Sequence, residues 1–223
     1  MERYLNLQEA TDGKLYSVKD EVLIGCNDCE GCHLCCTGMG KSIVLDPYDI
    51  FQLKKGLGIG FEGLMKDKIE LSVVDGLVLP NLALSGEEEK CGFLNKEGRC
   101  SIHNIRPGIC RLFPLGRIYN EKREFDYIFQ VNECPKRDKT PVKIEKWLDM
   151  TSLKKYEKFI SEWHFFLKDL SKLLEDSTED IRKNAGIVIL KWFYMDFPAG
   201  ISDFYSEFYL RLNKIKNVFE IGE

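Results

Sequence analysis

The chain has 223 residues, 44% of them hydrophobic, and can bury about 70% of the surface that its unfolded form exposes, so folding alone does not require a metal. Its net charge is −4, and its 32 Lys and Arg residues are spread among 36 acidic ones without a basic stripe, which argues against a nucleic-acid partner. Residues 1–20 lack the pattern of a secretory signal, and the longest apolar run, residues 185–190, is far short of the ~20 residues that cross a bilayer. We therefore expect a cytoplasmic protein without a membrane span.

The first part of the chain is expected to combine a helix with hairpins. Asp46 is a favoured helix N-cap and Pro47 suits the first helical position, which predicts a short helix that ends near Gly56. Asp75 and Gly76 form a favoured two-residue turn between apolar runs. The predicted hairpins cover residues 71–79, residues 91–102 with a loop at 95–98, and residues 118–130 around 120–123.

Helices are expected to dominate the last part of the chain. Apolar residues recur there at alternating steps of three and four, as on one helix face, and they are Leu153, Tyr156, Ile160, Trp163, Leu167, Leu170 and Leu174. A second helix is predicted over about residues 178–197, capped by Ser177 and stopped by Pro198. A third begins near Ser202 and carries inward Tyr205, Phe208, Leu212, Ile215 and Phe219.

These patterns predict an α+β fold with two domains. All nine cysteines lie between Cys26 and Cys134, and the remainder of the chain is rich in Lys and aromatic residues. We therefore expect a cysteine-cluster metal-binding domain over residues 1–140 and an antiparallel helical unit, packed on it, over residues 141–223. A coiled-coil seam along residues 153–174 is an alternative use of the apolar stripe.

Five of the cysteines are crowded into Cys26-Asn-Asp-Cys29-Glu-Gly-Cys32-His-Leu-Cys35-Cys36. In a reducing cytosol such a run indicates metal binding or redox chemistry rather than disulfides. Gly25, Gly31 and Gly38 would give the backbone the freedom that the turns need. The ligands Cys26, Cys29, Cys32 and Cys36 reproduce the C-x2-C-x2-C-x3-C spacing of bacterial ferredoxins, with Thr37 where proline is usual. Zinc is the competing interpretation, with Cys32 and Cys35 as one knuckle.

The other four cysteines, Cys91, Cys100, Cys110 and Cys134, are isolated in sequence, and each alone is typical of a small buried hydrophobe. Their surroundings favour another role. The hairpin over residues 91–102 would bring Cys91 close to Cys100. Cys110 is expected in a loop without regular helix, and Pro135 follows Cys134 as it often follows cluster ligands.

The run CxxCxxCC, the segment CGFLNKEGRCSIH, the loop RPGICRLFP and the late Cys-Pro pair occur together in this order. Over about residues 26–135 the chain thereby resembles the YkgJ-type CxxCxxCC cysteine-cluster family, described as zinc- or iron-chelating proteins. The resemblance implies eight metal ligands: Cys29, Cys32, Cys35, Cys36, Cys91, Cys100, Cys110 and Cys134. Cys26 then becomes an addition to the family set.

Adjacent side chains diverge by about 100° on a helix, so Cys35 and Cys36 are expected to serve different ions. Eight thiolates suit two four-cysteine sites, or one cluster with thiols left over. We expect all eight sulfurs to converge on one or two centres.

Several residues near the cysteines have two interpretations. Arg106 and Arg111 flank Cys110, where guanidinium donors could offset thiolate charge or simply hold the loop. His103 is a ligand, a donor to a sulfur or a turn residue. His33 is expected to face solvent, and His164 to be structural.

Three functions are compatible with these features. The first is a metal-binding protein with an iron-sulfur or iron centre, which ligand softness and spacing favour over zinc. The second is an S-adenosylmethionine-dependent protein lysine methylase, because flagellin lysine methylases have a similar cysteine cluster, although the chain lacks a G-x-G-x-x-G fingerprint. The third is a zinc-stabilised module whose helical unit binds a protein partner.

Overall fold

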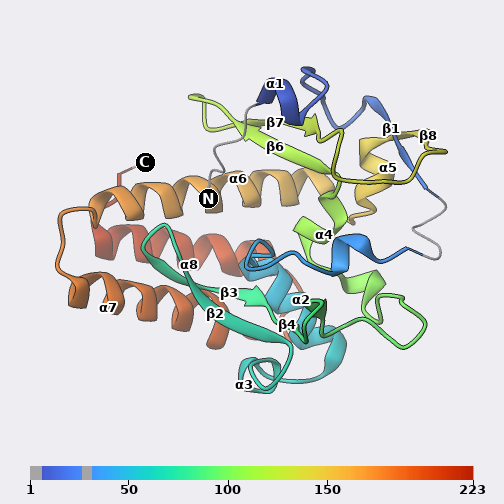
Figure 1. Cartoon of the computed structure of the whole chain (residues 1–223). Helices are drawn as coiled ribbons and strands as arrows, with labels where there is room; N and C mark the ends of the chain where they lie inside the picture. The colour runs from blue at the N-terminus through green and yellow to red at the C-terminus, as the bar shows by residue number, and fades with distance from the viewer. Residues whose placement is uncertain (1–6, 27–31, 223) are drawn as a thin grey trace. The chain divides into compact units, whose positions relative to one another are not determined.

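The computed structural model describes residues 7–26 and 32–222, and its mixture of helices with short antiparallel hairpins confirms the predicted α+β class (Figure 1). The chain forms two compact units, each made of two separate stretches. Unit 1 comprises residues 41–83 and 162–223, and unit 2 comprises residues 2–40 and 84–161. The division falls within helix α6 (Leu153–Leu173). The predicted domain boundary at residue 140 stays a prediction.

Unit 1 begins with the helix and the hairpin that local sequence patterns predicted. Helix α2 (Pro47–Leu57) carries a capping box, in which Asp46 accepts from the backbone N–H of Asp49 at 2.8 Å and Asp49 accepts from that of Asp46 at 3.0 Å. The short helix α3 (Phe61–Leu64) follows. Strands β2 (Ile69–Val74) and β3 (Leu77–Leu82) are joined by Asp75 and Gly76, whose φ angles of 50° and 81° fit a type I′ turn.

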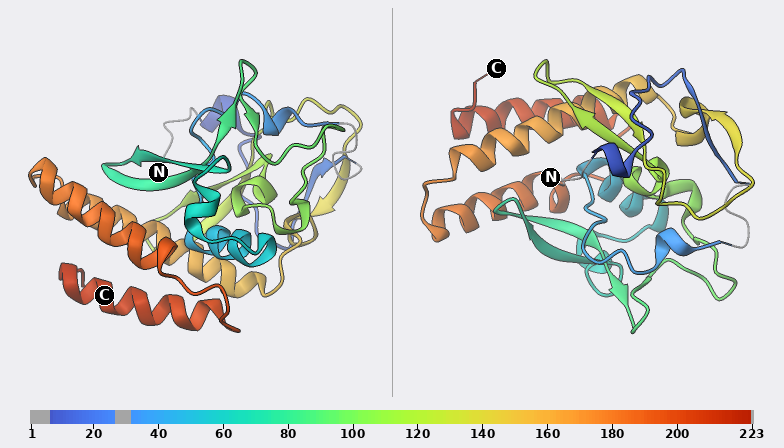
Figure 2. Two further views of the ribbon diagram at one scale, coloured as in Figure 1. Left: turned by 90° about the horizontal axis from the view of Figure 1, so that it is seen from below. Right: turned by 45° about the horizontal axis from the view of Figure 1, so that its top comes forward.

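The second stretch of unit 1 is helical, as predicted. Helix α7 (Glu179–Leu190) runs into a π-helical turn, η4 (Lys191–Met195), and helix α8 (Phe204–Phe219) follows. The N-cap of α7 is Thr178, so the prediction of Ser177 was wrong: Thr178 has the extended backbone of a cap, and its hydroxyl accepts from the N–H of Ile181 at 3.4 Å. Helix α7 packs against β3 (Figure 2), where a side chain at Gly186 would meet the Val78 nitrogen at 3.3 Å.

Aromatic side chains build the core of unit 1. Trp163 and Phe193 lie 4.9 Å apart between ring centroids, and Phe208 lies 5.6 Å from Phe193. Each of these residues is at most 1% exposed. The predicted apolar stripe is buried as well from Tyr156 onward, and Leu153 is partly buried, so burial within one chain accounts for the periodicity that had suggested a coiled-coil seam.

Unit 2 consists of short elements around a smaller core. Its strands form antiparallel pairs: β1 (Glu21–Gly25) with β8 (Thr140–Lys143), β4 (Leu84–Ser85) with β5 (Lys90–Cys91), and β6 (Leu115–Tyr119) with β7 (Phe125–Phe129). The pair β6–β7 confirms the hairpin predicted around residues 120–123. The helical elements are α1 (Leu7–Ala10), η2 (Leu34–Cys36), η3 (His103–Ile105), α4 (Gly108–Leu112) and α5 (Ile144–Leu148). The core contains Val22, Ile24, Leu112, Leu115, Tyr127, Ile144 and Leu148.

All nine cysteine positions fall in the two stretches of unit 2. Among the described helices, none combines the length and the hydropathy of a membrane span.

Candidate metal centre

The vicinal cysteines lie on the single 3₁₀ turn η2, which is tied to the next cysteine segment. The Cys36 N–H donates to the His33 carbonyl at 2.8 Å and closes the turn. Thr37 then pairs with Lys90 of β5, and the Gly38 N–H donates to the Glu89 carbonyl at 3.2 Å. Because Lys90 directly precedes Cys91, this pairing places Cys91 beside the turn that carries Cys35 and Cys36.

The loop between Cys91 and Cys100 is only partly the hairpin that was predicted. A bridge between Leu94 and Cys100 and a tight turn over residues 95–98 confirm its tip. Cys91 itself pairs with Leu84 of β4, because the chain turns sharply after it and the Leu94 N–H donates back to its carbonyl at 3.0 Å. At the tip, a Cβ on Gly98 would lie 2.9 Å from Nδ1 of His33, whose side chain is otherwise exposed, as expected.

Cys110 lies on helix α4, so the prediction of a loop without regular helix was wrong. Pro107 stands at the N-cap, where the missing N–H of proline costs no helical hydrogen bond. Its carbonyl accepts from the Arg111 N–H at 3.0 Å and completes the first turn. Proline therefore starts this helix rather than preventing it.

The ladder β1–β8 brings together the chain just before the first cysteine and just after the last. Gly25 pairs with Thr140, and a Cβ on Gly25 would lie 2.3 Å from the Thr140 hydroxyl oxygen. Gly25 is thus required for close approach of the strands, not for a turn. Gly38, with φ of 64°, does make the predicted turn, and Gly31 lies outside the described residues. Just before β8, the Lys139 ammonium donates to the Cys134 carbonyl at 2.8 Å.

Electrostatic interactions connect five of the eight predicted ligands. A hydrogen bond from Cys36 lowers the pKa of Cys35, burial opposes this, and the nearby Arg106 charge adds to it. The same hydrogen bond raises the pKa of Cys36, as do burial and the sulfurs of Cys35, Cys110 and Cys91. Burial raises the pKa of Cys100, which Arg106 opposes and Cys35 reinforces. A thiol environment of this kind releases protons when a cation binds.

Cys35 and Cys36 lie near enough to each other on this turn for each to shift the pKa of the other thiol. That the two cysteines serve different ions stays a prediction, since side-chain rotation at the end of a single 3₁₀ turn can also bring neighbouring sulfurs together. Two sulfurs on one four-coordinate ion are roughly 3.8 Å apart, given metal–sulfur bonds of about 2.3 Å. The vicinal pair is therefore compatible with a shared ion.

The two arginines beside Cys110 have different surroundings. Arg111 is buried and donates to backbone carbonyls, among them those of Arg106 at 3.2 Å and Asp149 at 3.0 Å, so it holds the loop. Arg106 donates from Nη1 to Nε2 of His103 at 2.6 Å, and its Nε is buried without a hydrogen-bond partner in the described part of the chain.

The cysteine thiols are suitable ligands for a soft cation, although the described side chains are not gathered around a single point. The eight described cysteines are all free thiols, the ligand type that binds zinc and iron. Within residues 7–26 and 32–222, no three His, Cys, Asp or Glu side chains are gathered closely enough to hold a metal ion. Cys29 lies outside those residues, Cys32 precedes the turn, and Cys134 follows β7. Convergence of all eight sulfurs stays a prediction.

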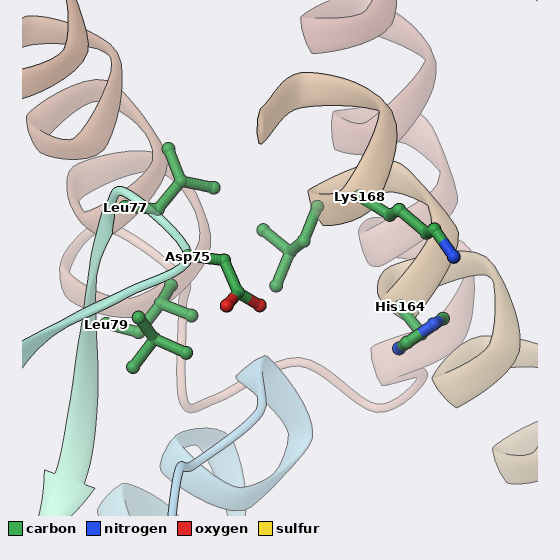
Figure 3. Close-up of a pocket in the computed structure, with 7 residues that line it drawn as sticks. Asp75, Leu77, Leu79, His164 and Lys168 are labelled. Carbon is green, nitrogen blue, oxygen red and sulfur yellow. The ribbon is translucent and has the colours of Figure 1, made fainter. Parts of the chain in front are cut away.

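A second grouping of polar residues lies in unit 1, where local sequence patterns did not indicate it. Asp75 at the hairpin turn and His164 and Lys168 on α6 line a hollow of about 280 Å³, including its open mouth (Figure 3). Its other walls are apolar and comprise Val74, Leu77, Leu79 and Leu167. His164 is only 7% exposed and its ring lies 5.0 Å from that of Phe165, as expected for a structural histidine.

Comparison with known proteins bears on the cysteine region. Residues 28–141, about half of the chain, match the model of the CxxCxxCC family, whose description reads "putative zinc- or iron-chelating domain". The match includes all eight predicted ligands, whereas Cys26 lies before it. No curated protein and no solved structure matches the chain. The family match supports metal binding on grounds independent of the geometry.

Proposed function

Because the chain belongs to the CxxCxxCC family, we propose that it binds iron, as a mononuclear centre or an iron-sulfur cluster, through the cysteines of unit 2. The proposed ligands are drawn from Cys29, Cys32, Cys35, Cys36, Cys91, Cys100, Cys110 and Cys134. The observation that supports the proposal most directly is the pairing of Thr37 with Lys90, which places Cys91 beside the turn that carries Cys35 and Cys36. Ligand softness favours iron over zinc.

The vicinal pair also supports one centre over two. Cys35 and Cys36 shift each other's pKa, so their placement is compatible with one shared ion. Cys91 and Cys110 influence Cys36 from the other stretch of unit 2. A bound iron centre would supply electron transfer or Lewis acidity, and these thiolates would hold it.

Metal and sulfide analysis of anaerobically purified protein tests the proposal. We expect iron, visible thiolate-to-iron absorbance and, for a cluster, acid-labile sulfide with at least about two irons per chain. Cys100→Ser should lower the iron content, while Cys26→Ser, outside the family match, should leave it unchanged. A colourless protein that contains zinc would overturn the choice of iron, and a metal-free protein that takes up neither metal would overturn metal binding.

The methylase hypothesis stays a prediction that rests on the cysteine cluster alone. Incubation with labelled S-adenosylmethionine and cell extract tests it, and absence of both cofactor binding and transferred label would count against it.

A further inference from the structure

The guanidinium of Arg106 lies among the cysteines with part of its hydrogen-bonding capacity unused. Its Nη1 donates to His103, but its Nε is buried and makes no hydrogen bond to any residue that the structure describes. A buried donor without an acceptor costs about 1–3 kcal/mol, so it is retained where something else uses it. The position therefore suggests an acceptor that arrives with a ligand.

Arg111, five residues later, is a contrasting case. Its guanidinium donates to the carbonyls of Asn104, Arg106 and Asp149, and these hydrogen bonds hold the loop to the end of α5. The clamp formed by Arg111 fixes the backbone at Arg106. Arg111 thus already holds the loop, and the hydrogen bond to His103 orients Arg106.

Two cysteine thiols lie near enough to Arg106 to feel its charge. Its charge acts on Cys35 from one stretch of unit 2 and on Cys100 from the other. A protonated thiol is a weak acceptor, whereas a thiolate bound to a metal carries charge and accepts strongly. Loading the centre would therefore create the acceptor that Nε lacks.

We propose that Arg106 is a positioning residue of the metal centre, which donates an N–H···S hydrogen bond to the thiolate of Cys35 or Cys100 when the metal is bound, with His103 orienting the guanidinium. This role rests on the proposed function. It separates the two arginines that look equivalent in the sequence: Arg106 serves the sulfurs and Arg111 serves the loop.

Co²⁺ binding provides the test, because its thiolate charge-transfer bands report the electronic state of the sulfurs. Removal of groups that hydrogen-bond to metal ligands typically weakens metal binding about 10- to 100-fold. We expect Arg106→Gln to weaken Co²⁺ binding by that factor and to move the sulfur-to-cobalt band to longer wavelength. Arg106→Lys keeps the charge without the planar fork and should give the same band shift with a smaller loss of affinity.

Arg99→Gln is the matched control, because Arg99 also acts on Cys100. Because Arg99→Gln removes only a nearby positive charge, it should weaken Co²⁺ binding by no more than about 3-fold and leave the sulfur-to-cobalt band in place. Equal effects of Arg99→Gln and Arg106→Gln, or an unmoved band in both Arg106 variants, would overturn the inference. Far-UV circular dichroism checks folding, and if the Gln variant does not fold, the Lys variant decides. Wild-type protein that binds no Co²⁺, Zn²⁺ or iron would refute the proposed function itself.

Discussion

Replacing Lys54 should destabilise unit 1 more than any neighbouring lysine would. The Lys54 side chain is 8% exposed, and its ammonium donates to three carbonyls at the end of the π-helical turn η4: those of Tyr194 at 3.2 Å, Met195 at 3.0 Å and Phe197 at 2.7 Å. All three donors of the ammonium are used. The last carbonyls of a helix otherwise have no intrahelical partner.

The magnitude for Lys54→Met follows from these contacts. Methionine has a similar length and preserves the packing of the side-chain stem. The loss of stability therefore comes only from the missing hydrogen bonds and from the carbonyls that are left without a donor. Hydrogen bonds to a charged group contribute about 1.5–3 kcal/mol each, and release of the buried charge offsets part of the sum. We expect the free energy of unfolding to fall by about 3 kcal/mol.

Urea denaturation followed by tryptophan fluorescence and circular dichroism measures this change. With a slope of about 2–3 kcal/mol per molar urea, the midpoint should fall by about 1–1.5 M. Lys55→Met is the matched control, since Lys55 is exposed on the same helix. If the free energy of unfolding falls by the same amount in both variants, the hydrogen bonds from Lys54 to the three carbonyls do not stabilise the fold and the reasoning fails.

Three further predictions concern the pH dependence of the Lys54 contribution, Gly25 and Asp46. Burial lowers the pKa of Lys54, so the folded protein loses the Lys54 proton at a lower pH than the unfolded chain does. Wild-type stability should therefore rise relative to that of Lys54→Met as the pH approaches 10.5, the ordinary pKa of lysine. A difference in stability that stays constant with pH would contradict this prediction. Gly25→Ala forces a clash with Thr140 and should lower the thermal midpoint of the protein, whereas Gly60→Ala, with open space at its Cβ, should not. Asp46→Ala removes a capping box and should cost about 1–2 kcal/mol in urea denaturation, while Asp46→Asn should restore much of it.

Local chemistry explains which predictions from the sequence were confirmed. The Asp46-Pro47 helix start and the Asp75-Gly76 turn depend on a few adjacent residues, and both elements have the predicted type and place. The choice between Ser177 and Thr178 as a cap depends on one residue of register, which sequence patterns do not resolve.

The remaining features depend on contacts between distant segments. Cys91 pairs with β4 rather than with the strand near Cys100, because the turn after it redirects the chain. The mutual influence of Cys35 and Cys36 depends on their place on a single 3₁₀ turn, which the hydrophobic periodicity does not predict. The hollow around Asp75 and His164 combines residues almost 90 positions apart. The eight-cysteine set, in contrast, came from the motif order, and its convergence stays a prediction.

The β1–β8 ladder has a consequence for metal exchange. Pairing of Gly25 with Thr140 closes a loop of about 115 residues that contains every cysteine, and closing such a loop costs roughly 4 kcal/mol of chain entropy or more. The backbone hydrogen bonds of this ladder offset part of the cost, so metal–thiolate bonds would not have to supply all of it. We therefore expect that a chelator removes the ion while the chain stays folded, as in a protein that binds its metal reversibly. A zinc finger, in contrast, unfolds when it loses its metal.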